Sequence, residues 1–156
     1  LKWSEKDYQE HKYVVDFIER KIKENGYITK ESKIEEQIAG EIIHLNNDFN
    51  FNLEIDLLSF IKTFHPTPAI AGIPLDKSLE IIQDLELHNR NFYCGFLVII
   101  DDKNYDFKVN LRCARFSEKE IQIFVGGGIT SQSNPDDEFM ETEIKSQTLL
   151  SVIKKK

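Results

Sequence analysis

The chain has 156 residues, of which 40% are hydrophobic and 11% are aromatic. This length and composition are enough to fill one core, so we expect a single domain over residues 1–156. The formal net charge of −7 and a pI near 5.1 exclude a strongly basic surface. We therefore expect neither a nucleic-acid partner nor binding to an anionic membrane.

The longest apolar run, residues 96–100, is far shorter than the roughly 18 residues needed to cross a bilayer. Cys94 and Cys113 lie in apolar, strand-like runs, which favours free buried thiols in a reducing compartment over a disulfide. Because the chain also carries no signal-peptide pattern, we expect a cytoplasmic protein. The chain begins with Leu1 and enters a helical pattern at once, so we expect a piece of a longer protein.

The first part of the chain predicts a helix followed by two strands. Residues 4–25 place apolar side chains at helical spacing and are followed by Gly26, which favours one long amphipathic helix. Apolar and charged residues alternate irregularly over residues 27–45, which indicates two edge-like strands joined by a turn. Residues 46–52 are rich in Asn and typical of a loop, and residues 55–61 predict a short, heavily buried helix.

Residues 64–74 read Phe-His-Pro-Thr-Pro-Ala-Ile-Ala-Gly-Ile-Pro. The three prolines in this run favour an extended and rigid path, because each fixes its own φ and pushes the preceding residue away from the α region. Such a loop forms either a wall of a binding site or a structural crossover. The pattern over residues 77–87 then predicts another amphipathic helix.

The second half of the chain predicts an antiparallel meander. Residues 92–100 and 105–116 read as strands joined by a hairpin turn, and residues 121–125 add a third strand. Arg112 lies within the second of these apolar runs. Since a guanidinium among apolar side chains is costly unless it is paired, Arg112 is a candidate functional residue.

The last strand runs into three glycines, residues 126–128, which either adopt a positive φ or let a ligand approach the backbone. Asn134 and Pro135 then predict the start of a helix, because Asn caps free amides and Pro suits the first helical position. On that helix Glu138, Glu141 and Lys145 are spaced to project from one face. Spacing alone leaves two readings of this face, a solvated ion pair or a binding site.

These stretches resemble the motifs of the chorismate-utilising enzymes, the family of isochorismate, salicylate, anthranilate and aminodeoxychorismate synthases. The resemblance is carried by five runs: K-D-x-x-E-H-x-x-V-V, F-H-P-T-P-A-x-x-G-x-P, R-x-F-Y-x-G, N-L-R-C-A-R and GGGIT…S-x-P-x-x-E-F-x-E-T-x-x-K. It spans nearly the whole chain but only the C-terminal part of such enzymes. Together with the meander and the two acidic helices, it predicts an α+β fold. We expect one mostly antiparallel sheet flanked by the first and last helices, which pack together.

The resemblance also implies a magnesium site built from carboxylates, the hard oxygen ligands that Mg²⁺ prefers. Glu10 and Glu141 correspond to the direct ligands, while Asp7 and Glu138 correspond to ligands that act directly or through water. Without the resemblance, Asp7 and Glu10 read as a solvated acidic turn near a helix N-terminus.

The substrate that the resemblance implies is chorismate or isochorismate, a dianion that needs local positive charge in this acidic chain. The residues expected to hold its two carboxylates are Tyr93, Arg112, Lys145 and the backbone amides of Gly126, Gly127 and Gly128, the glycines forming an anion-binding nest. The residues expected to face its ring are His65, Ala69 and Ile70. His65 is the catalytic candidate within this chain, because an imidazole suits proton transfer.

The activity that the resemblance favours is that of an isochorismate synthase supplying menaquinone or siderophore synthesis. Ala69 and the V-V-x-x-I run after Glu10 support this choice. The alternatives are a salicylate, anthranilate or aminodeoxychorismate synthase and a non-catalytic ligand-binding or scaffold domain. In isochorismate-forming relatives the Lys and Glu that act as base and acid lie before the segment equivalent to Leu1, so we expect this chain to be inactive alone. We also expect it to expose apolar surface and to form homo-oligomers.

Overall fold

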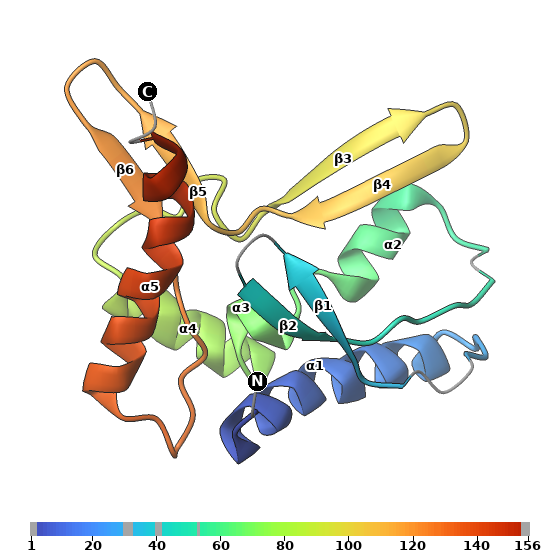
Figure 1. Ribbon diagram of the computed structural model, residues 1–156. Helices are drawn as coiled ribbons and strands as arrows, with labels where there is room; N and C mark the ends of the chain where they lie inside the picture. Colours follow the sequence, from blue (N-terminus) through green and yellow to red (C-terminus); the bar gives the residue numbers. More distant parts are fainter. Residues whose placement is uncertain (1–2, 30–32, 40–41, 53, 154–156) are drawn as a thin grey trace. The chain divides into compact units, whose positions relative to one another are not determined.

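The structure, a computed structural model, describes residues 3–29, 33–39, 42–52 and 54–153. It contains helices and antiparallel strands, which confirms the predicted α+β class (Figure 1). The chain divides into two compact units, Leu1–Gln83 and Asp84–Lys156, and each is described by itself. A single domain over the whole length stays a prediction, as does the packing of the first helix against the last.

The elements follow the chain in a simple order. Those that begin in the first unit are α1 (Glu5–Glu24), β1 (Glu35–Ala39), β2 (Ile42–Asn46), α2 (Leu57–Phe64), α3 (Pro68–Ala71) and α4 (Leu75–Leu85). Those of the second unit are β3 (Phe96–Asp101), β4 (Asn104–Val109), β5 (Cys113–Phe116), β6 (Ile121–Phe124) and α5 (Pro135–Ile153). None of the helices in the described part of the chain is both long and apolar enough to cross a membrane.

Helix α1 begins at a capping box. The Ser4 hydroxyl oxygen accepts a hydrogen bond from the Asp7 amide at 3.1 Å, and Asp7 Oδ2 accepts from the Ser4 amide at 2.8 Å. These bonds satisfy amides that have no partner within the helix. At the other end Asn25 caps the helix and Gly26 has a φ of 77°, so the predicted helix and its glycine stop are confirmed.

The core of the first unit forms on one side of α1, which packs against α2 and α3. Phe17 and Ile22 of α1 are buried, as is Ala71 at the end of α3. A chain of aromatic rings extends this core, with centroids 5.0–5.9 Å apart, and its members are Tyr27, Phe51, Phe64 and Phe60. The apolar face of α1 thus holds the segments that follow it in the sequence.

The two predicted edge strands are present as an antiparallel pair, with a register from Glu35↔Asn46 to Ala39↔Ile42. They begin later than predicted, because residues 27–29 and 33–34 form no strand. The predicted turn between them includes residues 40–41, which lie outside the described residues.

The proline-rich run differs from its prediction. Residues 64–74 are not extended throughout, because Pro68 starts the short helix α3, and proline suits the first turn of a helix. Gly72 ends α3 with a φ of 77°, and α4 then confirms the predicted amphipathic helix. Helix α2 is also present, but no residue in it is buried, so the prediction of a heavily buried helix was wrong.

The second unit contains two hairpins and a helix. Strands β3 and β4 pair from Phe96↔Val109 to Asp101↔Asn104 around the predicted turn. Strands β5 and β6 pair from Cys113↔Phe124 to Phe116↔Ile121. Helix α5 begins as predicted, since Asn134 Oδ1 accepts hydrogen bonds from two amides of the first turn at 2.9 and 3.3 Å.

The predicted strand over residues 105–116 is broken, and Arg112 therefore does not lie within a strand. The Asn110 amide donates to the Gly95 carbonyl at 2.8 Å, and Arg112 has a φ of 48°, which turns the backbone out of the ladder. β4 and β5 consequently belong to different hairpins. The described strands form three two-stranded antiparallel sheets rather than one continuous meander.

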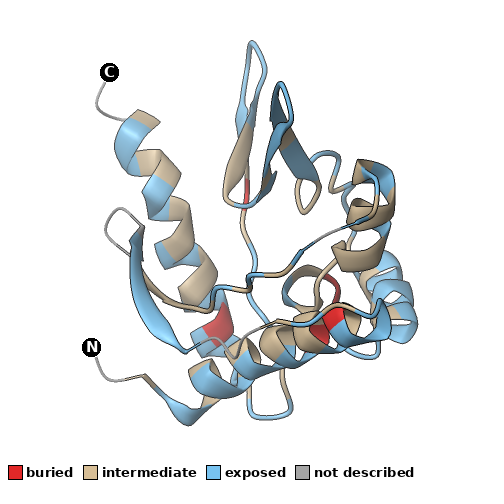
Figure 2. Ribbon diagram, turned by 90° about the vertical axis from the view of Figure 1, so that its right-hand side faces the viewer, coloured by how far each residue is buried: buried red, intermediate tan, exposed pale blue. Residues whose placement is uncertain are grey.

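The β3–β4 hairpin carries apolar side chains that remain exposed. They are Phe96, Leu97, Ile99, Ile100, Tyr105 and Val109. Figure 2 shows that buried residues are few and that much of the ribbon is coloured as exposed. Exposed apolar surface was expected, whereas an oligomer that covers it stays a prediction.

Replacement of Ile22 by Ala should lower the free energy of unfolding by about 2–5 kcal/mol, because it removes methyl groups from a packed site and leaves a cavity. Ile22 is 0% exposed, whereas Ile28, four residues beyond the end of α1, is 90% exposed. Ile28→Ala is therefore the matched control and should change stability by less than about 0.5 kcal/mol. Urea denaturation followed by circular dichroism measures both, and equal effects would contradict the described core.

Candidate functional site

The glycine run after β6 is a place where side chains approach the backbone closely. A Cβ added to Gly126 would lie 2.7 Å from Tyr93 Oη, and one added to Gly127 would lie 3.4 Å from Glu138 Oε2. None of residues 126–128 has a positive φ. Close approach to Tyr93 Oη, rather than a positive φ, explains Gly126 among these glycines. Their role in substrate binding stays a prediction.

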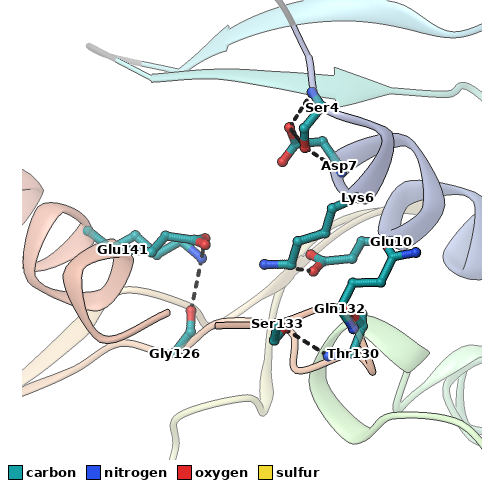
Figure 3. Close-up of polar contacts among 10 residues, drawn as sticks. Ser4, Lys6, Asp7, Glu10, Gly126, Thr130, Gln132, Ser133 and Glu141 are labelled. Atoms are coloured by element: carbon teal, nitrogen blue, oxygen red, sulfur yellow. Dashed lines mark hydrogen bonds and ion pairs between the residues drawn. The ribbon is translucent and has the colours of Figure 1, made fainter. Parts of the chain in front are cut away.

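Three side chains of α5 converge at Gly127. The position of its added Cβ lies 3.4 Å from Glu138 Oε2, 3.9 Å from Glu141 Oε1 and 3.8 Å from Lys145 Nζ. This confirms that the three residues share one face of the helix. Lys145 Nζ lies 2.5 Å from Glu141 Oε1 and donates to the Gly126 carbonyl at 3.0 Å (Figure 3). The Lys145 ammonium group therefore links α5 to the end of β6.

Burial distinguishes Glu138 and Lys145 from the members of an ordinary solvated ion pair. Glu138 is 6% exposed, and the side chain of Lys145 is 22% exposed. Glu141, at 44%, reaches solvent with part of its carboxylate. Since a shielded charge is costly without compensation, two carboxylates and an ammonium group at one glycine form a site suited to charged ligands.

Tyr93 is held between a ring and a cation. Its ring stacks on the buried Phe124 with centroids 5.8 Å apart, and the Arg90 guanidinium carbon lies 5.9 Å from its centroid. Arg90 also forms an ion pair with Glu86, and the hydrogen bond that Arg90 donates lowers the pKa of the Glu86 carboxyl group. Desolvation raises the pKa of Tyr93 to about 12, so its hydroxyl group is neutral at pH 7 and can donate a hydrogen bond.

Arg112 and the two cysteines lie near the ends of the hairpins of the second unit. Arg112 is half-buried in the turn between β4 and β5. Cys94 and Cys113 are both free thiols, as predicted, but they are half-buried rather than fully buried. Burial raises the pKa of the Cys94 thiol, which keeps it protonated at pH 7.

In the first unit, Asp7 and Glu10 have different surroundings. Asp7 Oδ2 accepts from Ser4 in the capping box, which gives Asp7 a structural role. Glu10 Oε1 lies 3.4 Å from Lys6 Nζ (Figure 3). The next residue, His11, is hydrogen-bonded through Nε2 to Asn47 Oδ1 at 2.5 Å. The capping-box contact with Ser4 supports the interpretation of Asp7 as part of an acidic turn. A role for Asp7 at a metal stays a prediction.

The ring-facing candidates lie around α3. His65 follows the last residue of α2 and is half-buried, and desolvation lowers the pKa of its imidazole. The imidazole is therefore neutral at pH 7. Ala69 is exposed on α3, and Ile70 beside it is half-buried.

The structure thus brings together six candidates of the second unit at one place, namely Tyr93, Gly126, Gly127, Glu138, Glu141 and Lys145. A place for Arg112 and Gly128 beside them stays a prediction. The predicted set of four carboxylates takes two members from each unit, so its convergence stays a prediction. Within each unit, no three described His, Cys, Asp or Glu side chains gather closely enough to hold a metal ion. The sequence analysis missed Lys6, although its spacing of four residues from Glu10 is a signal for an ion pair.

Comparison with known proteins places these observations in a family. A family model described as chorismate binding enzyme matches residues 1–154. The isochorismate synthase EntC of Escherichia coli K12 is 30% identical over 153 residues, which cover 96% of this chain and 39% of that protein. The isochorismate synthase DhbC of Bacillus subtilis is 30% identical over 152 residues, which cover 94% of this chain and 38% of that protein.

Two further matches extend the comparison. Anthranilate synthase component 1 of Saccharolobus solfataricus is 29% identical over 162 residues, covering 96% of this chain and 37% of that protein. The solved structure of Bacillus anthracis DhbC, assigned as a 2,3-dihydroxybenzoate-specific isochorismate synthase, superposes with a TM-score of 0.83 at 29% identity. That match covers 96% of this chain and 41% of the solved chain. The chain therefore spans about two-fifths of the length of these relatives.

Replacement of Gly126 by Ala should destabilise the second unit by about 1–3 kcal/mol, because the new methyl group would lie 2.7 Å from Tyr93 Oη. Tyr93→Phe removes that oxygen and leaves the Cζ atom at 3.8 Å, an ordinary contact. In the Tyr93→Phe background, Gly126→Ala should therefore cost less than about 1 kcal/mol. A double-mutant cycle by urea denaturation measures the difference, and simple additivity would rule out the close approach.

Proposed function

Because the chain belongs to the family of chorismate-binding enzymes, we propose that it forms the carboxylate-binding and metal-binding part of a magnesium-dependent isochorismate synthase. The observation that carries this proposal is the convergence of Glu138, Glu141 and Lys145 at Gly127. It provides oxygen ligands for a cation and an ammonium group for an anion at one place. The isochorismate synthases among the relatives support the choice of reaction.

The residues present fit a hard divalent cation. Glu138 and Glu141 present carboxylate oxygens within 4 Å of the position that a Cβ on residue 127 would take. The Lys145 ammonium group already acts as a cation there, 2.5 Å from Glu141 Oε1. Carboxylate oxygens are the protein ligands that Mg²⁺ prefers. Glu141 and Glu10 would be its direct ligands, with Glu138 and Asp7 binding directly or through water.

Bound magnesium would supply the positive charge that a dianionic substrate needs in an acidic protein. The chain's own residues would orient that substrate. The planar guanidinium of Arg112 would bind one carboxylate of the substrate. The Lys145 ammonium group and the neutral Tyr93 hydroxyl group would also donate hydrogen bonds to a carboxylate. Lys145 Nζ already donates to the Gly126 carbonyl, and the backbone amides of residues 126–128 would add further donors. Around the ring, Ala69 and Ile70 would exclude water, while the neutral His65 imidazole could accept or pass a proton.

The reaction adds water at C2 of chorismate and expels the hydroxyl group from C4, so a base must take a proton from the water and an acid must protonate the leaving group. We assign those two roles to residues outside this chain, in the part of the family fold that the chain does not span. The chain would then bind and orient chorismate rather than complete the proton transfers. The isochorismate would serve menaquinone or siderophore synthesis.

A second candidate is an anthranilate synthase, and the Saccharolobus relative is the observation that favours it. An anthranilate synthase would bind the two carboxylates of chorismate with the same residues but would add ammonia instead of water. The lyase reaction that gives salicylate and pyruvate is a further variant of the same chemistry. Product analysis separates them, because each gives a different aromatic or cyclohexadiene acid.

We expect the chain alone to form no isochorismate from chorismate in excess Mg²⁺, because each general acid or base typically contributes about 10²–10⁴-fold to the rate. Liquid chromatography after incubation measures the product. A longer polypeptide that carries this chain should form isochorismate under the same conditions. Anthranilate formed with ammonia, or salicylate with pyruvate, would replace the proposed reaction with one of its alternatives.

Arg112→Met should weaken chorismate binding by the chain about tenfold to a hundredfold in saturating Mg²⁺, because a charge-assisted hydrogen bond to a carboxylate is worth about 1.5–3 kcal/mol. Arg115→Met is the matched control, since Arg115 is exposed in β5 and its loss changes the net charge equally. Isothermal titration calorimetry measures both affinities. Equal weakening by the two variants would remove Arg112 from the site and leave only a long-range charge effect.

A further inference from the structure

Both glutamates proposed as direct metal ligands already have a lysine partner four residues away. In α1, Lys6 Nζ lies 3.4 Å from Glu10 Oε1, and in α5, Lys145 Nζ lies 2.5 Å from Glu141 Oε1 (Figure 3). The order differs, because the lysine precedes its glutamate in α1 and follows it in α5. Each predicted ligand thus has a cation of the chain itself beside it.

These two lysines are better shielded than a typical surface pair of the same chain. The side chains of Lys6 and Lys145 are 26% and 22% exposed, whereas Lys12 and Asp16, also four residues apart in α1, are 62% and 54% exposed. Water screens the Lys12 pair almost fully, while a shielded charge acts more strongly on its neighbours. Lys6 and Lys145 are therefore the lysines placed to affect a cation at these carboxylates.

Lys145 is also fixed in position. Besides Glu141 it contacts the Gly126 carbonyl at 3.0 Å, and its Nζ and a carboxylate oxygen of Glu138 both lie within 4 Å of the same point at Gly127. Two carboxylates and one ammonium group leave a single net negative charge there. A divalent cation that approaches Glu141 must displace this ammonium group or accept its repulsion.

We propose that Lys145 and Lys6 are resident counter-ions that compete with the divalent cation for Glu141 and Glu10. This inference rests on the proposed function, since the cation is the magnesium of that function. Without the cation, each lysine neutralises the carboxylate beside it. When the cation binds, the ammonium groups are released.

The release has a consequence for the substrate. Lys145 is a proposed contact of a chorismate carboxylate, and it can reach that ligand only when Glu141 no longer holds it. Cation binding should therefore favour substrate binding, and thermodynamic linkage requires that the substrate favour the cation equally. Removal of Lys145 should act on the two ligands in opposite directions, whereas loss of a merely structural lysine would weaken both.

The test measures Mn²⁺ binding to the chain. Electron paramagnetic resonance detects the free Mn²⁺, and added Mg²⁺ should displace the bound ion. Lys145→Met and Lys6→Met should each lower the Kd for Mn²⁺ about threefold to fivefold, the effect of removing a partly shielded ion pair. Lys12→Met, which changes the net charge equally, should leave that Kd unchanged within twofold. Lys145→Arg keeps the positive charge and should retain the Mn²⁺ affinity of the unaltered chain.

Chorismate affinity in saturating Mg²⁺ gives the second readout, and Lys145→Met should lower it. Mn²⁺ binding that is equal or weaker in Lys145→Met and Lys6→Met, with circular dichroism spectra like that of the unaltered chain, would overturn the inference. Absence of saturable Mn²⁺ binding in all variants would overturn it as well. Tighter Mn²⁺ binding without any chorismate binding would support the inference and contradict the proposed substrate.

Discussion

The candidate site depends on one steric constraint, the absence of a side chain at Gly126. A Cβ at Gly126 would lie 2.7 Å from Tyr93 Oη, whereas a Cβ at Gly127 would make ordinary contacts with the side chains of α5. At Gly126 the ammonium group of Lys145 reaches the backbone carbonyl, and α5 lies against β6. The electrostatics follow from this approach, because charges act strongly on one another only at short range and away from water.

Two helix starts place the acidic residues of the chain. In α1 the capping box fixes the first turn, and Glu10 follows one turn later beside Lys6. In α5 the Asn134 cap fixes the first turn, and Glu138 lies at its end, buried. Local hydrogen bonds of the backbone thus determine where each carboxylate emerges. The family model matches residues 1–154 and therefore includes both helix starts.

Much of this was predictable from the sequence, and the failures have physical causes. Helix caps, hairpin turns and the shared face of Glu138, Glu141 and Lys145 follow from local patterns, and the structure confirms them. The break at Arg112 was missed because a positive φ in a non-glycine residue leaves no clear trace in an apolar run. The sequence pattern left two explanations for the glycines, a positive φ or the approach of a ligand to the backbone, whereas contact with Tyr93, distant in sequence, explains Gly126. Only the folded chain reveals such contacts.

The hairpin formed by β3 and β4 affects the risk of aggregation while the polypeptide is being synthesised. Among the described residues its two strands pair only with each other, so each strand has an outer edge of backbone donors and acceptors. With apolar side chains exposed along it, such a ribbon recruits other strands. During synthesis this hairpin must therefore meet its proper neighbours or a chaperone promptly. If it meets another nascent copy first, the same backbone edge serves as a template for aggregation.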